Sequence, residues 1–197
     1  MTDVEQTRRG DGRTDKRGRM VESACRLLHE QGVAGTTLAD VAKDAGVVVG
    51  NIYYYFKTKD DLVQAVIDAH ADMIRTALGA LDQDPDPRAR LKGFTRVLAA
   101  SGDYAARFGC PHGTLSSELG KREDGMDRAS AAMMTLYVDW AQRQFRLLGQ
   151  DESAARDHAV MFVSVYQGAS LLANTFRDPG LLVAQARQLD AWIDAVV

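Results

Sequence analysis

The feature that most constrains the fold of this chain is the helical spacing of its apolar residues, which recur three and four positions apart along most of its length. This spacing gathers apolar side chains on one face of a helix. Only four prolines occur in 197 residues, so long helices can run without interruption. No segment shows the alternation of a half-buried strand, and no internal repeat is visible. We therefore predict an all-α fold, for which the 46% hydrophobic content supplies a core.

Breaks in this spacing divide the chain into helices. The run DQDPDP at residues 82–87 is the clearest break, and Gly32 is placed to end the first helix as a C-terminal cap. The stretch GCPHG at residues 109–113 predicts an irregular segment followed by a short helix. Besides two short helices within residues 36–62, the expected helices cover residues 16–31, 58–81, 87–107, 115–119, 124–148, 152–177 and 179–196.

Residues 36–62 read TTLADVAKDAGVVVGNIYYYFKTKDDL. Thr37 precedes a short apolar run at helical spacing, and Asp40 three residues later completes a capping box that starts a helix. Gly46 interrupts this helix and supplies the unusual backbone angle of a tight turn, after which residues 48–56 form another helix. Two short helices joined in this way make a helix-turn-helix. Its small core against the first helix should consist of Val41, Ala42, Val47, Ile52 and Phe56.

The second helix of this unit has the residue types that a major groove accepts. Asparagine bonds base edges, tyrosine hydroxyls bond phosphates, and aromatic rings contact thymine methyls. The three consecutive tyrosines point around the helix, so at least one should pack against the rest of the protein. Two lysines that follow, one at the start of the next helix, suit phosphates. The candidate DNA-binding residues are Thr37, Val48, Val49, Gly50, Asn51, Tyr53, Tyr54, Tyr55, Lys57 and Lys59.

Positive charge gathers ahead of the first helix, although the whole chain carries a net charge of −3. Between residues 8 and 19, six basic residues stand against two acidic ones. A basic arm beside a small helical domain is one electrostatic sign of DNA binding, and a solvated tail without function is the alternative. Residues 1–15 lack apolar periodicity, so we predict a disordered basic arm there.

The run GVVVGNIYYYFKTKDDL, preceded by TLADVAKDAGV, resembles the signature of the tetracycline-repressor (TetR) family of transcriptional regulators. The resemblance is strong over residues 16–62. It implies an N-terminal three-helix helix-turn-helix DNA-binding domain at residues 16–62 and a C-terminal helical ligand-binding and dimerisation domain at residues 63–197. It also implies that Thr37 and Lys59 hold phosphates, that Asn51 faces bases, and that the first two tyrosines contact the DNA backbone or base methyls.

One departure from the family pattern lies at the start of the second short helix. Many members of the family have Ser, Thr or Pro there, whereas this chain has Val48 and Val49. Valine cannot cap a helix or hydrogen-bond a base, and it offers apolar contact with thymine methyls instead.

The resemblance implies a ligand-responsive transcriptional regulator. We predict a repressor, not an enzyme, that binds a palindromic double-stranded DNA operator as a homodimer and is released by a small-molecule inducer. The helices at residues 152–177 and 179–196 would pair with their copies in a four-helix bundle.

The sequence also bears on compartment and cofactors. The N-terminus is polar, no uncharged apolar run of membrane-spanning length stands out, and the cysteines, Cys25 and Cys110, lie far apart. The four histidines do not show metal-ligand spacing. We expect a cytoplasmic protein with no membrane segment, metal or cofactor.

The stretch GCPHG, followed by TLSSEL, resembles a segment in a subgroup of the same family that includes electrophile-responsive repressors. Cys110 lies there between helices that would line a pocket, so we expect an apolar or electrophilic inducer. Cys110 could act by packing alone, or it could react if a nearby positive charge lowers its pKa. The candidate ligand-binding residues are Tyr104, Phe108, Cys110, Met133, Tyr137, Trp140 and Tyr166.

Two other interpretations are compatible with the sequence. Cys110 and His112, two positions apart, could serve a thiol-dependent enzyme, although no oxyanion-hole motif accompanies them. The chain could also be a DNA-binding protein without a ligand, architectural or activating.

Overall fold

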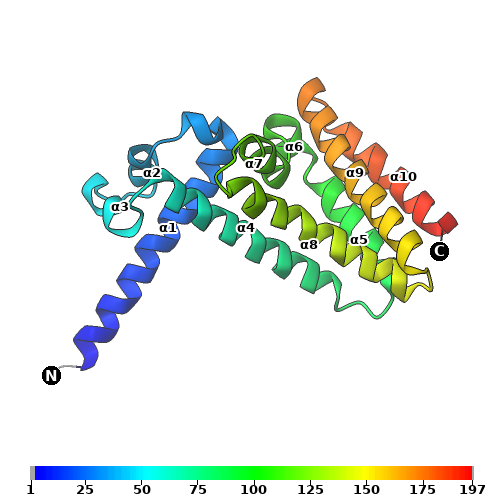
Figure 1. Cartoon of the computed structure of the whole chain (residues 1–197), viewed down its shortest axis with the longest axis horizontal. Helices are drawn as coiled ribbons and strands as arrows, with labels where there is room; N and C mark the ends of the chain where they lie inside the picture. Colours follow the sequence, from blue (N-terminus) through cyan, green and yellow to red (C-terminus); the bar gives the residue numbers. More distant parts are fainter. Residues whose placement is uncertain (1–2, 197) are drawn as a thin grey trace.

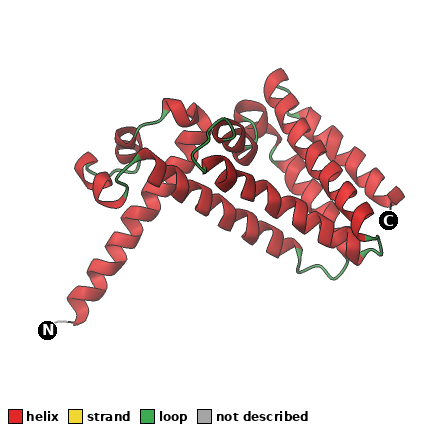
Figure 2. Cartoon of the chain, viewed as in Figure 1, coloured by secondary structure: helices red, strands yellow, loops and turns green. Residues whose placement is uncertain are grey.

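The computed structural model describes residues 3–196, and the side chains of residues 16–196. Every regular element in this part of the chain is a helix, which confirms the all-α prediction (Figure 2). The molecule is elongated, with α2 and α3 at one end and α9 and α10 at the other (Figure 1). The helices are α1 (Asp3–Gly35), α2 (Leu38–Asp44), α3 (Val49–Tyr55), α4 (Lys59–Leu81), α5 (Pro87–Ala100), α6 (Gly102–Phe108), α7 (Pro111–Leu119), α8 (Met126–Leu147), α9 (Glu152–Phe176) and α10 (Gly180–Val196).

Local signals start α2 and α4 where the sequence predicts. The Thr37 hydroxyl accepts the Asp40 backbone N–H at 3.2 Å, and the Asp40 carboxylate accepts the Thr37 N–H at 2.9 Å. Thr58 and Asp61 form the same box at the start of α4. Each such cap stabilises a helix by about 1 kcal/mol. The helices before and after α3 therefore begin at defined residues, which limits where the short helix between them can lie.

Two glycines make the turns that the sequence predicts. Gly46, with φ +65°, turns the chain between α2 and α3. Gly32, with φ +78°, interrupts the helical backbone of α1, so the last residues of α1 form a separate turn. Positive φ is costly for residues with a Cβ.

Helix α4 connects the two ends of the molecule. It packs on α1 near its start and on α8 further along, and it runs away from α2 and α3 towards the C-terminal helices (Figure 1). Its buried face contributes Leu62, Val66 and Ile74 to one continuous core. The boundary predicted at residue 62 falls inside this helix and stays a prediction. Where the sequence predicts a disordered arm at residues 1–15, the described backbone of residues 3–15 is helical and continues α1. A role of this arm in DNA binding stays a prediction, because residues 1–2 and the side chains of residues 3–15 lie outside the described part.

Two sequence predictions about the middle of the chain were wrong. The single helix expected at residues 87–107 is two helices, α5 and α6, which break at Ser101. Here Gly102 approaches the backbone of Pro179 so closely that a Cβ would lie 3.1 Å from its carbonyl oxygen. The irregular stretch expected at 109–113 becomes helical at Pro111, because proline suits the first helical position and the Cys110 sulfur accepts the Gly113 N–H.

Helix α9 has the length and composition of a membrane span, with a mean hydropathy of 1.2 over 18 residues. No such segment was expected from the sequence, yet residues 158–176 contain no Asp, Glu, Lys or Arg. Only 33% of that window is buried within the chain. The same composition occurs in core helices of soluble proteins, and α9 packs against α8, α10 and α6.

Candidate nucleic-acid interface and ligand cavity

Most of the residues predicted to bind DNA lie on α3 or next to its start, whereas Thr37 precedes α2 and the two lysines follow α3. Ile52 is fully buried, while Val48 at the helix start has an exposed fraction of 74%. Tyr55 packs against the core, as expected for one tyrosine of the three, and Tyr54 meets its ring edge-on at 5.1 Å. Apart from Tyr55 and Lys59, which are half-buried, all the candidate DNA-binding residues are exposed. Most of them are therefore open to solvent, and their role in DNA binding stays a prediction.

The start of α3 lacks the cap that its neighbours have, since Val48 makes no side-chain hydrogen bond to the first turn. The exposed Val48 side chain neither caps α3 nor packs in the core, so the fold does not explain why a valine stands there. Thr37 differs, because its hydroxyl also donates to the Asp40 carboxylate at 2.6 Å. Any phosphate contact by Thr37 would therefore involve a residue already fixed by its capping box.

Ionic contacts hold this unit on α1. Arg26 pairs with Asp44 at the end of α2 and with Glu30 on its own helix. The Arg26 guanidinium lowers the pKa of Asp44 by its hydrogen bond. The Arg17 guanidinium lies over the Phe56 ring, 5.3 Å from the centroid, as in a cation–π contact. The helix-turn-helix of α2 and α3, called the head from here on, is thus tied to α1 beside its turn and just after α3.

An apolar cavity of about 300 Å³ lies among α4, α5, α6, α7, α8 and α9. Helices α4 and α5 supply hydrocarbon walls, including Leu78 and Phe94, whereas α7, α8 and α9 supply polar groups at the other end. Three lining residues are also exposed to solvent and form its mouth: Met73, Val97 and Tyr104.

Two hydrogen-bonded pairs form the polar end of the cavity. The Cys110 sulfur lies 2.9 Å from the Tyr166 hydroxyl, and His112 Nδ1 lies 3.0 Å from the Tyr137 hydroxyl. Burial lowers the pKa of His112 to about 3, so its imidazole is neutral at pH 7. Burial also raises the pKa of both tyrosine hydroxyls, which stay protonated.

Four of the residues predicted to bind ligand line this cavity: Tyr104, Cys110, Tyr137 and Tyr166. Met133 and Trp140 instead lie in the core, where the Trp140 indole donates to Asp82 at 2.9 Å. Phe108 packs with tilted rings against Tyr104 and His29 and does not line the cavity. Sequence reasoning missed Met73, Phe94, Val97 and Ser170, which carry no signal beyond ordinary helix-face positions.

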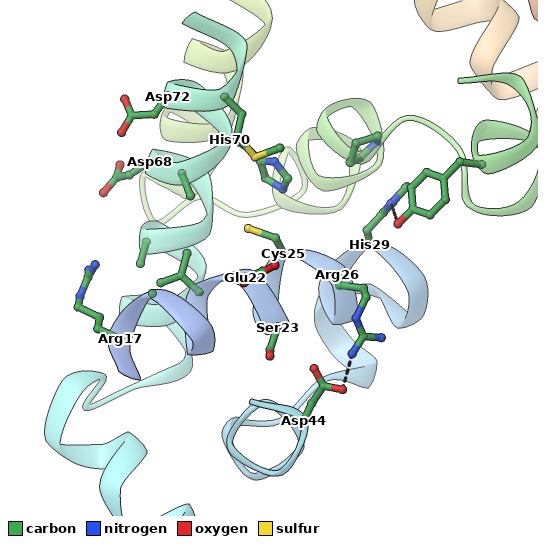
Figure 3. Close-up of a pocket in the computed structure, with 17 residues that line it drawn as sticks. Arg17, Glu22, Ser23, Cys25, Arg26, His29, Asp44, Asp68, His70 and Asp72 are labelled. Carbon is green, nitrogen blue, oxygen red and sulfur yellow. Dashed lines mark hydrogen bonds and ion pairs between the residues drawn. The ribbon is translucent and has the colours of Figure 1, made fainter. Parts of the chain in front are cut away.

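A second hollow, a cleft of about 880 Å³, runs between α1 and α4 beside the cavity (Figure 3). Met73, Tyr104 and Pro111 line both spaces. The cleft is open to solvent, and its charged lining residues are Arg17, Glu22, Arg26, Asp44, Asp68 and Asp72. Small-molecule sites are mostly enclosed and apolar with a few polar groups, which favours the smaller cavity as the ligand site.

Helix α7 connects the cavity to the DNA-binding helices. Cys110 and His112 at its start line the cavity, while Glu118 near its end accepts the Val33 backbone N–H of α1 at 2.7 Å. Just beyond it, Arg122 makes two hydrogen bonds of 2.9 Å to the Asp60 carboxylate at the start of α4. These bonds lower the pKa of Asp60. One short element therefore contacts both the cavity and the helices that carry α2 and α3.

A helix-turn-helix with an exposed second helix, joined through α4 to a second helical region, defines a helix-turn-helix DNA-binding regulator. The family model for bacterial regulatory proteins of the tetR family matches residues 21–66. The model for the C-terminal domain of LmrA/YxaF-like transcriptional regulators matches residues 87–188. The chain belongs to the tetR family, and it is a DNA-binding transcriptional regulator rather than an enzyme.

Relatives of this chain carry similar descriptions. It is 29% identical over 179 residues to an uncharacterized HTH-type transcriptional regulator of Mycobacterium tuberculosis, covering 88% of this chain and 91% of that protein. It is 25% identical over 170 residues to the HTH-type transcriptional regulator LmrA of Bacillus subtilis, covering 83% and 89%. A TetR transcriptional regulator from Legionella pneumophila has the same fold, with a TM-score of 0.80, 20% identity and coverage of 91% and 95%.

Proposed function

We propose that this regulator is a cytoplasmic repressor that binds a palindromic operator as a homodimer and leaves the DNA when a small molecule fills the cavity. The observation that carries the proposal is the position of the cavity, since α7 lines it at one end and holds α1 and α4 at the other. A ligand shifts a conformational equilibrium only if it binds one state better than the other. A molecule that fits the cavity in one position of α7 would do so.

Binding of two operator half-sites requires two copies of the head, because a single helix-turn-helix makes too few contacts for tight specific binding. The surface of α9 and α10 supports a homodimer. These two helices expose five large apolar side chains: Val160, Leu171, Leu172, Phe176 and Val183. Exposed apolar side chains on neighbouring helices are typical of protein interfaces when they form one patch.

The environment of Cys110 favours packing over reaction. Its side chain is buried and contacts the Tyr166 hydroxyl. Its neighbour His112 is neutral and bonds Tyr137, so it supplies no positive charge to activate the thiol. A reactive cysteine and an electrophilic inducer are therefore the second candidate. If Cys110 acts by packing alone, the Cys110→Ser variant still responds to its inducer. If Cys110 reacts with the inducer, the variant stays bound to DNA.

The DNA-binding half is tested by selecting duplexes from a random library and measuring affinity for the enriched operator across a salt series. Lys59→Ala should weaken binding to all duplexes and reduce the slope of log affinity against log salt by about one. Glu152→Ala, an exposed change far from α3, is the control and should leave the slope unchanged. An unchanged slope for Lys59→Ala removes this lysine from the phosphate contacts.

The ligand-controlled half is tested on the same operator complex with a library of small aromatic and aliphatic compounds and mild electrophiles. Release of the operator by at least one compound, together with reduced sensitivity when Ala77 at the cavity wall is enlarged to Phe, supports the proposal. If no compound releases the DNA, this half of the proposal fails and a DNA-binding protein without a ligand is the better description.

A further inference from the structure

The lining of the cavity restricts the charge of its ligand. Among the described residues that line it, none is Asp, Glu, Lys or Arg. The only titratable base there is His112, and it is neutral because burial disfavours its protonated form. An ion entering this space would lose its hydration without gaining a counter-charge, which is costly. The cavity therefore selects against anions and cations alike.

The His112–Tyr137 pair leaves one proton without an acceptor. The pair holds an imidazole N–H and a phenol O–H but makes one hydrogen bond, at 3.0 Å. If Tyr137 donates, the proton on His112 Nε2 is left over, and that atom is buried without a partner in the described structure. If Nδ1 donates instead, the tyrosine O–H is left over. In either tautomer one proton has no acceptor, but Nε2 is fully buried and does not open into the cavity. The donor that a ligand can reach is therefore the Tyr137 O–H, with Nδ1 donating to the tyrosine oxygen.

The Cys110–Tyr166 pair behaves in the same way. Its two protons, S–H and O–H, share a single contact of 2.9 Å. The sulfur already accepts from the Gly113 N–H at 3.4 Å and the Gln167 amide at 3.7 Å. Again one proton has no acceptor among the described groups.

The His29–Tyr104 pair at the mouth shows the contrast. His29 Nε2 lies 3.1 Å from the Gly109 carbonyl oxygen, which can only accept, so Nε2 carries the proton. His29 Nδ1 then accepts the Tyr104 O–H at 3.2 Å. Both protons are used, and this pair has no surplus. The unsatisfied donors therefore belong to the inner, polar end of the cavity.

We propose that the cavity binds an uncharged molecule with a single-ring-sized apolar body and a hydrogen-bond-accepting oxygen, such as a carbonyl, placed against His112–Tyr137 and Cys110–Tyr166. The hydrocarbon walls from α4 and α5 take the body, and about 300 Å³ is at the small end of ligand cavities. The inference rests on the proposed function only in taking the cavity as the regulatory site.

Three probes of similar shape test the ligand class on the full-length protein without DNA: acetophenone, ethylbenzene and benzoate. Titration should place acetophenone about fivefold tighter than ethylbenzene, the value of one hydrogen bond, and benzoate weakest. The carbonyl carbon resonance of labelled acetophenone should move in the direction of hydrogen bonding when bound. Benzoate as the tightest probe, equal affinity for acetophenone and ethylbenzene, or no binding by any of the three overturns the proposal.

Substitutions identify the donors, and they must be made in pairs because removing one partner leaves the other with a free proton. The double variant His112→Phe with Tyr137→Phe keeps both rings and should lower the preference for acetophenone over ethylbenzene towards one. His158→Phe removes an imidazole that bonds Gln150 outside the cavity lining, so it is the control and should keep the wild-type preference. If the double variant fails to fold, the resonance shift measured on the wild-type protein still decides the question.

Operator release is measured separately, so the two proposals can fail independently. Acetophenone that binds in the expected order without releasing DNA supports the ligand class and counts against induction. A contrary order of affinity counts against the ligand class, whatever happens to the DNA.

Discussion

The DNA-binding head and the ligand cavity are built from interactions of different range. The head depends on contacts three or four residues apart, such as Thr37 with Asp40 and Thr58 with Asp61. The cavity depends on contacts such as Cys110 with Tyr166, 56 residues apart. A substitution in the head should therefore change DNA recognition and the stability of a single helix, whereas one in the cavity region should change overall stability and regulation together.

Between the two regions lie few polar contacts. Glu118 with Val33 and Arg122 with Asp60 join the end of α7 to α1 and α4. The same segment lies close to Gly32, where a Cβ would be 3.3 Å from the Glu118 carboxylate. This junction is where regulation would pass from one region to the other.

The largest effect is expected from splitting the dimer, because both regions would then lose their function together. Leu171→Glu places a charge on the exposed surface of α9, where the side chain is 65% exposed and not needed for folding. Operator affinity should fall by about a hundredfold or more, because the two heads no longer bind as one unit. Sedimentation should show a 21.5 kDa monomer instead of a dimer.

Leu147→Glu, an equally exposed leucine at the end of α8, is the control and should stay dimeric. Ala169 would be a poor choice, since it is buried within the protomer. A Leu171→Glu protein that still sediments as a dimer would contradict the proposed interface.

Acidification should weaken the cavity region more than the head. Burial lowers the pKa of His70 to about 4 and that of His112 to about 3, whereas residues 36–62 contain no histidine. A histidine whose folded pKa is depressed contributes stability above its unfolded pKa near 6.5, and this is lost as the pH falls towards the folded value.

As the pH falls from 6.5 to 4.5, each of these two histidines should lower the free energy of unfolding by up to about 1.4 kcal/mol per pH unit. Denaturant melts at several pH values measure this slope. His112→Gln should flatten the slope, and an unaltered slope would mean that this histidine does not contribute.

Breaking the junction should uncouple the regions while leaving each intact. Arg122→Ala removes both bonds to Asp60, in a pair that is partly exposed, so the effect on stability should stay within about 1 kcal/mol. The ratio of operator affinities with and without an inducer should fall about fivefold. The control is Arg143→Ala, which removes an ion pair with Asp82 away from the junction. Full inducer response in Arg122→Ala would place the coupling elsewhere.

The smallest effect isolates the head. Val48→Ser supplies the missing cap of α3, so the free energy of unfolding should rise by about 1 kcal/mol. The same change removes an exposed apolar group that is suited to a thymine methyl, and selection should show a weaker thymine preference at one operator position. Val48→Ala separates the two effects, because alanine does not cap α3 and keeps only part of the apolar contact with thymine. A variant with unaltered base preference would show that Val48 does not read the DNA.

The amino-acid sequence by itself determined the fold class, the capping boxes and the surface of α3, because helical spacing, caps and turns depend on residues close together in the chain. Even at this range it was incomplete at α7, where Pro111 and Cys110 start a helix in place of a loop. Only the tertiary structure decided which aromatic residues line the cavity and which lie behind it.

Tyr137 and Trp140 stand three residues apart on α8, yet the first lines the cavity and the second bonds Asp82. The spacing of apolar residues along a helix decides which face it buries. Which neighbour each residue on that face contacts is decided by how the six helices around the cavity pack together. The His112–Tyr137 and Cys110–Tyr166 pairs each have a proton without an acceptor only because folding brings two donors together away from water.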